Sequence, residues 1–104
     1  MKRFEVWLVM TNPEYGRVVD NLGLCAIVTP DELNNLTSLL VAPMTTSHQE
    51  IPSRVVCYFE GAKGYIMIDQ IRSVEKCCFI KKLGELEPEV QVNLCDCLQE
   101  FFAY

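Results

Sequence analysis

The feature that most constrains this chain is a succession of short apolar segments, each ended by glycine, proline or polar residues. Short segments rich in Val, Ile and aromatic side chains are typical of β-strands, whereas helices need longer stretches with a helical period. We therefore predict strands over the following segments: Phe4–Met10, Leu22–Val28, Leu39–Ala42, Arg54–Phe59, Tyr65–Ile68 and a shorter sixth strand at Phe79–Ile80.

Turn-forming residues define the ends of these predicted strands. We expect Pro43 to end the third strand, because proline has no N–H to donate to a neighbouring strand. Glu60–Gly64 contains two glycines and predicts a turn, after which the fifth strand is expected to continue through Asp69–Arg72. Thr29, followed by proline and two acidic residues, has the pattern of an N-cap and predicts a short helix.

A single long helix is predicted at the end of the chain. Pro88 suits its first position and Glu87 precedes it as a modest cap. Apolar residues then recur at helical spacing on one face: Val90, Leu94, Cys97, Leu98 and Phe101. The order of elements predicts one mainly β domain over residues 1–104, built as a small curved antiparallel sheet or partial barrel with the helix covering one face.

Composition limits the class of protein. Hydrophobic residues make up 50% of the 104 residues and charged residues 22%, which is typical of a globular protein. No stretch approaches the ~18 apolar residues of a membrane span, and Phe4–Met10 lacks the length and cleavage site of a signal peptide, so we expect a cytoplasmic protein without membrane contact. The net charge of −5 argues against non-specific binding of duplex DNA but leaves room for a local basic patch.

Six cysteines and one histidine are the residues to test for a metal site. Cys25 and Cys57 lie inside apolar segments and are expected to be buried. Cys77–Cys78 and the Cys95-x-Cys97 pair lack the spacing of zinc ligands, and His48 is distant from both in the sequence. We therefore expect reduced thiols, no bound metal and no cofactor.

Polar residues at the ends of the predicted strands are the candidates for chemistry. Thr45, Thr46 and His48 follow the third strand, and Asp69 with Arg72 follows the fifth. A hydroxyl, an imidazole, a carboxylate and a guanidinium can perform metal-free acid–base chemistry on a phosphodiester. Each residue also has an ordinary structural role as a turn former, a loop residue or a surface charge. The residues alone leave an enzyme and a binding module equally open.

Several segments, taken together and in this order, resemble the MazF/PemK/Kid family of toxins from bacterial toxin–antitoxin pairs. The most specific are Asp69–Val74, similar to the family's D-Q-[IP]-R-[ST]-[VI], and Val41–Thr46, similar to V-x-P-[IV]-T-[ST]. The other matching segments are Arg3–Val9, Asn12-Pro13 with Gly16, Ile27–Pro30, Lys82–Gly84 and Leu86–Glu89.

The resemblance implies a small SH3-like barrel of the MazF/Kid/CcdB type that forms a homodimer. It also implies a ribosome-independent endoribonuclease, or mRNA interferase, that cuts single-stranded RNA at short sequences. Family members need no metal, use the 2′-hydroxyl next to the scissile phosphate as nucleophile, and are bound by an antitoxin with an acidic, extended tail. Thr45, Asp69 and Gln70 match the family's catalytic positions, and we expect RNA contacts from Arg72, His48 and Arg54.

The first loop and second strand depart from the family pattern. Val18–Val19 replaces an acidic–polar pair, and Gly23–Leu24 stands where the family has R-P, so the family's main transition-state arginine is absent. Arg17 is the candidate substitute cation, because it stands where one family branch has an active-site histidine. Three interpretations follow: a nuclease with a rewired site, a toxin that binds a protein as the gyrase poison CcdB does, or an inactive homologue that titrates an antitoxin.

Overall fold

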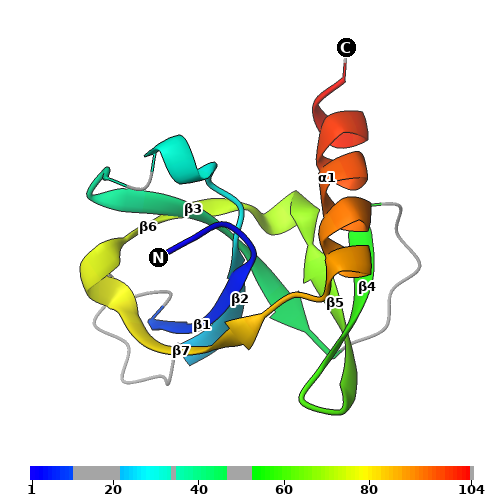
Figure 1. Ribbon diagram of the computed structural model, residues 1–104, viewed down its shortest axis with the longest axis horizontal. Coiled ribbons are helices and arrows are strands. Elements are labelled where there is room, and N and C mark those ends of the chain that lie inside the picture. Colours follow the sequence, from blue (N-terminus) through cyan, green and yellow to red (C-terminus); the bar gives the residue numbers. More distant parts are fainter. Residues whose placement is uncertain (11–21, 34, 47–52, 104) are drawn as a thin grey trace.

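The computed structural model describes residues 1–10, 22–33, 35–46 and 53–103, and Figure 1 shows its elements. The structure is mainly β with a C-terminal helix, as predicted. Its strands are β1 (Glu5–Met10), β2 (Leu22–Ile27), β3 (Ser38–Thr45), β4 (Arg54–Phe59), β5 (Ala62–Met67), β6 (Arg72–Glu75) and β7 (Phe79–Glu85). Its helices are the 3₁₀ turns η2 (Asp31–Leu33), η3 (Ile68–Gln70) and η4 (Lys76–Cys78), and the α-helix α1 (Pro88–Phe102).

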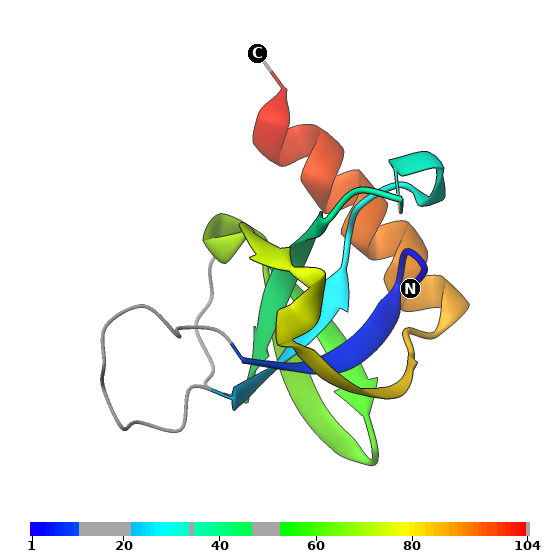
Figure 2. The ribbon, with the colours of Figure 1, turned by 90° about the vertical axis from the view of Figure 1, so that its left-hand side faces the viewer.

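The strands form one antiparallel sheet in the order β4-β5-β3-β2-β1-β7, and β6 also pairs with β3. Strand β3 is central, because β2 lies along one of its edges while β6 and β5 share the other. The sheet curls into a half-barrel in which β1, β2, β3, β6 and β7 surround one side (Figure 1). Helix α1 stands outside this curl, against β4 and η3, as the turned view in Figure 2 also shows.

Two apolar cores lie on the two faces of the sheet, because successive side chains of a strand point to opposite faces. The helix-side core contains Ala26 and Ala42, together with Leu94 of α1. The barrel core, inside the curl, contains the neighbouring residues Ile27 and Val41. The remaining buried members of the barrel core are Val9, Cys25, Leu39, Val74 and Phe79. Packing on both faces of the sheet thus holds the strands in place.

Strand β3 does not end at Pro43, so that prediction was wrong. Pro43 pairs with Cys25 of β2 and lies between the stretch of β3 that pairs with β6 and the stretch that pairs with β5. A strand tolerates a residue without an N–H at such a break. The strand therefore continues to Thr45, which makes Thr45 part of the sheet rather than of a loop.

The segment from Glu60 to Glu75 also differs from its prediction. The β4–β5 turn consists of Glu60 and Gly61, which have φ angles of 52° and 79°, and Phe59 pairs with Ala62. Two positive φ values are typical of the tight type I′ hairpin, so β5 begins earlier than predicted. The fifth strand does not continue through Asp69, because η3 interrupts it before β6 begins.

Strand β7 is longer than the predicted Phe79–Ile80. It runs to Glu85 along β1, although Lys81 and Lys82 give it little apolar character. Thr29 does not start a regular helix, because its hydroxyl accepts a hydrogen bond from the amide of Leu40 at 2.6 Å and only η2 follows.

The predicted C-terminal helix is confirmed. It begins at Pro88, and Glu87 occupies its N-cap position without a capping hydrogen bond from its side chain to the described residues. Val90 and Leu94 are buried, and the helix-side core extends along α1 to Cys97 and Leu98. The apolar face ends there, because the Phe101 side chain at the last turn is 47% exposed.

Candidate active site

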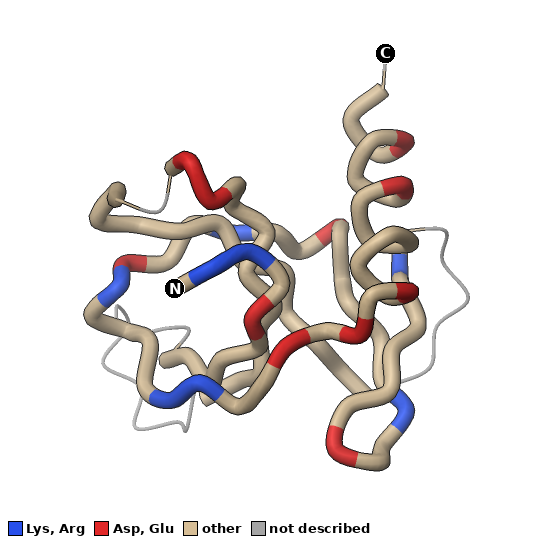
Figure 3. Tube along the Cα trace, in the orientation of Figure 1, with Lys and Arg blue, Asp and Glu red and all other residues tan. Residues whose placement is uncertain are grey.

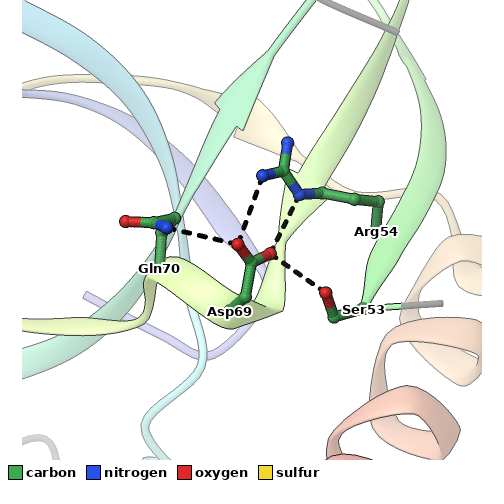
Figure 4. A network of polar contacts seen from close by, with 4 residues as sticks. All are labelled: Ser53, Arg54, Asp69 and Gln70. Atoms are coloured by element: carbon green, nitrogen blue, oxygen red, sulfur yellow. Dashed lines mark hydrogen bonds and ion pairs between the residues drawn. The ribbon is translucent and has the colours of Figure 1, made fainter. Parts of the chain in front are cut away.

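Asp69 is the centre of a polar cluster formed by β4 and η3. Arg54 donates two hydrogen bonds to its carboxylate, from Nε to Oδ1 at 2.9 Å and from Nη2 to Oδ2 at 3.2 Å. The Ser53 hydroxyl donates to Oδ1 at 3.1 Å, and the Gln70 amide donates to Oδ2 at 3.2 Å. Figure 4 shows the three neighbouring side chains converging on the carboxylate. We call Ser53, Arg54, Asp69 and Gln70 the Asp69 cluster.

The sheet register brings these residues together. Arg54 begins β4 and lies opposite Met67, the last residue of β5. The amide of Ile68 donates to the carbonyl of Ser53 at 2.9 Å, which ties η3 to the start of β4. The amide of Ile71 then donates to the Ile68 carbonyl at 3.3 Å and closes the 3₁₀ turn, so Asp69 faces Arg54.

The cluster holds Asp69 in its ionised form. The Arg54 guanidinium, with smaller help from Gln70 and Ser53, lowers the pKa of Asp69 to about 2 against the opposing effect of burial. The side chain of Arg54 is 10% exposed and that of Asp69 is 26% exposed, so the ion pair is partly shielded from solvent. A carboxylate with so low a pKa is a weak general base but orients a cation well.

Thr45 lies at the other side of the candidate site, at the end of β3. It is half-buried and pairs with Tyr65 of β5. It also lines a small pocket of about 90 Å³ with Leu24, Met44 and Lys63. The remaining lining residues are Thr46, Cys57, Phe59, Ala62 and Gly64. The pocket is largely apolar, with the two threonines and one lysine as its polar groups.

Gly23 lies close to Thr45 in the sheet. The β2–β3 register pairs Cys25 with Pro43, so Gly23 and Thr45 lie two residues further along the same two strands. Gly23 is inside β2 and pairs with Val9 of β1, so its backbone is extended. An extended backbone does not require glycine. The backbone at Gly23 can therefore take a residue with a side chain, such as the arginine that the family resemblance implies.

Arg72 is placed on the same face of the sheet as these residues. Arg72 pairs with Val41. Val74, two residues further along β6, belongs to the barrel core. Burial raises the pKa of the Cys25 thiol to about 11, and the charge of Arg72 acts in the opposite direction. Because that charge reaches Cys25, Arg72 lies near the end of the barrel core where Gly23 is found.

Of the residues predicted for the site, the structure brings Asp69, Gln70 and Arg54 into direct contact. Thr45 and Arg72 lie on strands β3 and β6 of the same sheet. Arg17 and His48 lie outside the described residues, as do Val18 and Val19, so their roles remain predictions.

The sequence analysis missed two features. Ser53 was not singled out, and the bond between Arg54 and Asp69 was not foreseen. The RNA contact expected of Arg54 stays a prediction. A second polar cluster was also missed: Glu5 is 6% exposed, accepts a hydrogen bond from the Trp7 indole at 2.9 Å and pairs with Lys82 at 3.2 Å. Burial raises the pKa of Glu5, but bonds to Trp7, the Lys2 backbone and Lys82 leave it below its usual value. The sequence signal for this second cluster was Glu5, an acidic residue within a predicted strand.

The described residues contain neither a candidate metal-binding group nor a helix able to span a membrane. In residues 1–10, 22–33, 35–46 and 53–103, no group of three or more His, Cys, Asp or Glu side chains could hold a metal ion. None of the helices described above has the length and hydrophobicity needed to cross a membrane. The six cysteines are present as free thiols.

Comparison with known families gives the assignment. The family described as PemK-like, MazF-like toxin of type II toxin–antitoxin system matches residues 2–102. The chain belongs to this family. The match confirms the resemblance noted in the sequence. No curated protein matches the chain significantly.

Solved structures agree on the fold. An endoribonuclease in complex with its cognate antitoxin from Mycobacterial species is 22% identical, with a TM-score of 0.80 over 96% of this chain and 92% of that one. MazF from Deinococcus radiodurans is 16% identical, with a TM-score of 0.81 over 100% and 97% of the two chains. A MazE–MazF structure from the same organism is 18% identical, with a TM-score of 0.76 over 99% and 95%. These likenesses establish the MazF-type fold.

Proposed function

We propose that this chain is the toxin of a type II toxin–antitoxin pair and that it cleaves single-stranded RNA at short sequences without a metal ion. The observation that carries the proposal is the Asp69 cluster, in which an ionised carboxylate holds the Arg54 guanidinium. The chain that carries this cluster belongs to a family of toxins. The similarity to an endoribonuclease from Mycobacterial species supports the same type of reaction.

The proposed reaction has the following steps. The RNA 2′-hydroxyl loses its proton and attacks phosphorus, the bond from phosphorus to the 5′-oxygen breaks, and the leaving oxygen takes up a proton. The products are a 2′,3′-cyclic phosphate and a 5′-hydroxyl. Asp69 positions Arg54, whose third nitrogen, Nη1, points away from the carboxylate in Figure 4. We assign Arg54 and the Thr45 hydroxyl to the phosphate oxygens, where donors stabilise the developing charge.

The charge distribution supports RNA binding on the β4–η3 side of the sheet and not on the helix. Helix α1 carries Glu89, Asp96 and Glu100 and no Lys or Arg, and Figure 3 shows only acidic residues along it. RNA phosphates are repelled by such a surface. Arg54, Lys63 and Arg72 lie instead on β4, β5 and β6.

The test is a cleavage assay with purified protein and single-stranded RNA in the presence of EDTA. We expect cleavage with cyclic-phosphate ends, and no cleavage of a substrate with a 2′-deoxy sugar at the cut. Loss of activity in EDTA, or cleavage of the deoxy substrate, would contradict the mechanism.

A second candidate function is binding of a protein without RNA cleavage. It is favoured by the apolar character of the strand ends near Gly23, where Met10 is 42% exposed and Leu22 is 44% exposed. A preparation that leaves RNA intact but inhibits growth, with inhibition lost in Leu22→Asp, would support this alternative.

We also propose a homodimer and an antitoxin partner with an acidic, extended tail. Exposed Val92, Phe101 and Phe102 on α1 are apolar area that a second chain could cover. The MazE–MazF structures from Deinococcus radiodurans support a partner of the antitoxin type. A monomer in sedimentation at micromolar concentration would contradict the dimer.

A further inference from the structure

Two adjacent cysteines, Cys77 and Cys78, lie in a turn outside the Asp69 cluster. They belong to η4, which connects β6 to β7. The amide of Lys76 donates to the carbonyl of Thr37 at 2.9 Å and anchors the start of the turn. Cys77 is exposed, whereas Cys78 is half-buried and packs against the barrel core. The pair is therefore accessible from one side and supported from the other.

The two thiols are hydrogen-bonding neighbours. The thiol of Cys78 contacts that of Cys77, and the Cys77 Sγ also donates to the Glu75 carboxylate at 3.6 Å. The neighbouring thiol, with smaller effects from burial and Glu75, raises the pKa of Cys77. Cys77 is thus held in its protonated thiol form beside Cys78, which disfavours reactions that need a free Cys77 thiolate.

The other four cysteines lack this arrangement. Cys25 and Cys57 are buried in the two cores. Cys95 and Cys97 are two residues apart on α1, so their side chains project roughly 200° apart around the helix axis. They are also two thiols, both half-buried, but their diverging side chains cannot bind one atom together, which makes them an internal control.

We propose that Cys77 and Cys78 form a two-sulfur binding site for a thiophilic ligand, of the class of monosubstituted trivalent arsenicals. Such a compound, R–As(OH)₂, condenses with two thiols. Two arsenic–sulfur bonds form, two arsenic–oxygen bonds break, and the two thiol protons leave with the two hydroxides as water. No atom changes its oxidation state, so no oxidant is needed.

The number of sulfurs defines which ligands fit. A monosubstituted arsenical has two exchangeable positions, which the pair fills. Structural zinc needs four ligands. The Glu75 carboxylate lies beside Cys77, but in the described residues no group of three or more His, Cys, Asp or Glu could hold a metal ion. The site should therefore select the arsenical over zinc.

The single tryptophan of the chain lies where it can report on the site. Trp7 packs against the barrel core, as Cys78 does, and its ring lies 5.8 Å from that of Phe79 at an interplanar angle of 75°. Phe79 directly follows Cys78. A ligand that draws the two sulfurs together in η4 should shift Phe79 and change the fluorescence of Trp7.

The experiment is a titration of the whole purified protein with phenylarsine oxide in a buffer containing a monothiol. We expect one phenylarsenic group per chain by intact mass and a change in Trp7 fluorescence that saturates at the same ratio. A 1,2-dithiol should reverse both signals. Excess zinc should not compete. None of these readouts uses RNA cleavage, so they are independent of the proposed nuclease.

Variants decide whether the pair is the site. Cys77→Ser changes an exposed side chain and should remain folded, while abolishing the stoichiometric mass increase and the fluorescence change. Cys78→Ser should do the same, with circular dichroism to check its fold. The double variant Cys95→Ser, Cys97→Ser should bind like the parent. Binding that survives Cys77→Ser, or that disappears with the Cys95 and Cys97 substitutions, would overturn the proposal.

Discussion

The Asp69 cluster and the strand ends around Gly23 belong to the same sheet but differ in how completely they are equipped with polar groups. Around Asp69, four hydrogen bonds from three neighbours hold one carboxylate, and a guanidinium is fixed by two of them. Around Gly23, the family resemblance implies an arginine, and this chain has a glycine in an extended strand with leucines on both sides.

The difference indicates where a cation can still act. Strand β4 carries Arg54, which Asp69 orients, whereas β2 carries no Lys or Arg. Because the backbone at Gly23 is extended, an arginine there needs no unusual backbone conformation. The two regions can therefore be tested separately, by adding a charge to one and removing it from the other.

The largest effect is expected from Gly23→Arg. A guanidinium beside Thr45 would meet the charge that develops on the phosphate, and such a donor is worth about 10²–10³ in rate. We expect cleavage of single-stranded RNA to rise by that factor. Gly23→Met, which adds length without charge, is the matched control. A folded Gly23→Arg protein with unchanged cleavage would show that Gly23 does not limit activity.

Removal of the Arg54 guanidinium should have the next largest effect. Arg54→Met should lower cleavage by about 10²-fold and raise the pKa of Asp69 toward its ordinary value, because the carboxylate loses its main partner. The pKa is measured by NMR titration. Arg54→Lys keeps the charge but loses the two-nitrogen fork, so its cleavage should be intermediate. Equal activity of the Met and Lys variants would contradict a role for the charge.

Much of the fold could be predicted from local patterns, and the exceptions have physical causes. Both bounds of Arg54–Phe59 and the start of the helix at Pro88 were predicted as observed, because alternating burial and a proline start are local signals. Strand β7 was mostly missed, since its stability comes from pairing with β1 and from the Lys82–Glu5 ion pair rather than from apolar residues.

The candidate site shows the same limit. Asp69 and Gln70 could be singled out by their position after a strand and by their match to a family motif. The pairing of Asp69 with Arg54 could not, because the two residues are 15 positions apart and meet only through the register that places Arg54 opposite Met67. A register of this kind depends on the hairpin turn, and the turn at Glu60–Gly61 is shorter than predicted.

A smaller effect is expected from Thr45→Val, which removes one hydroxyl and keeps the shape of the side chain. A neutral hydrogen bond is worth about 1 kcal/mol, so cleavage should fall roughly fivefold. Thr46→Val, at the exposed next residue, is the control and should leave the rate unchanged. If the two variants lose activity equally, Thr45 has no special position.

The smallest effect concerns stability and acid. The pKa of Asp69 in the folded protein is about 2, below its ordinary value of 3.8, so the Arg54 pair stabilises the fold above about pH 4 and loses this contribution as the pH falls toward 2. Solvent screening of the partly exposed carboxylate reduces the contribution to about 1 kcal/mol. Asp69→Asn should therefore be less stable than the parent at pH 7 by that amount, and the two proteins should converge between pH 4 and pH 2 in thermal melts. Asp96→Asn removes an equal charge from α1 without touching the pair and should show no such convergence. A gap between parent and Asp69→Asn that stays constant down to pH 2 would mean that the difference in stability does not come from the ionised carboxylate, and would contradict a stabilising role for the Asp69–Arg54 ion pair.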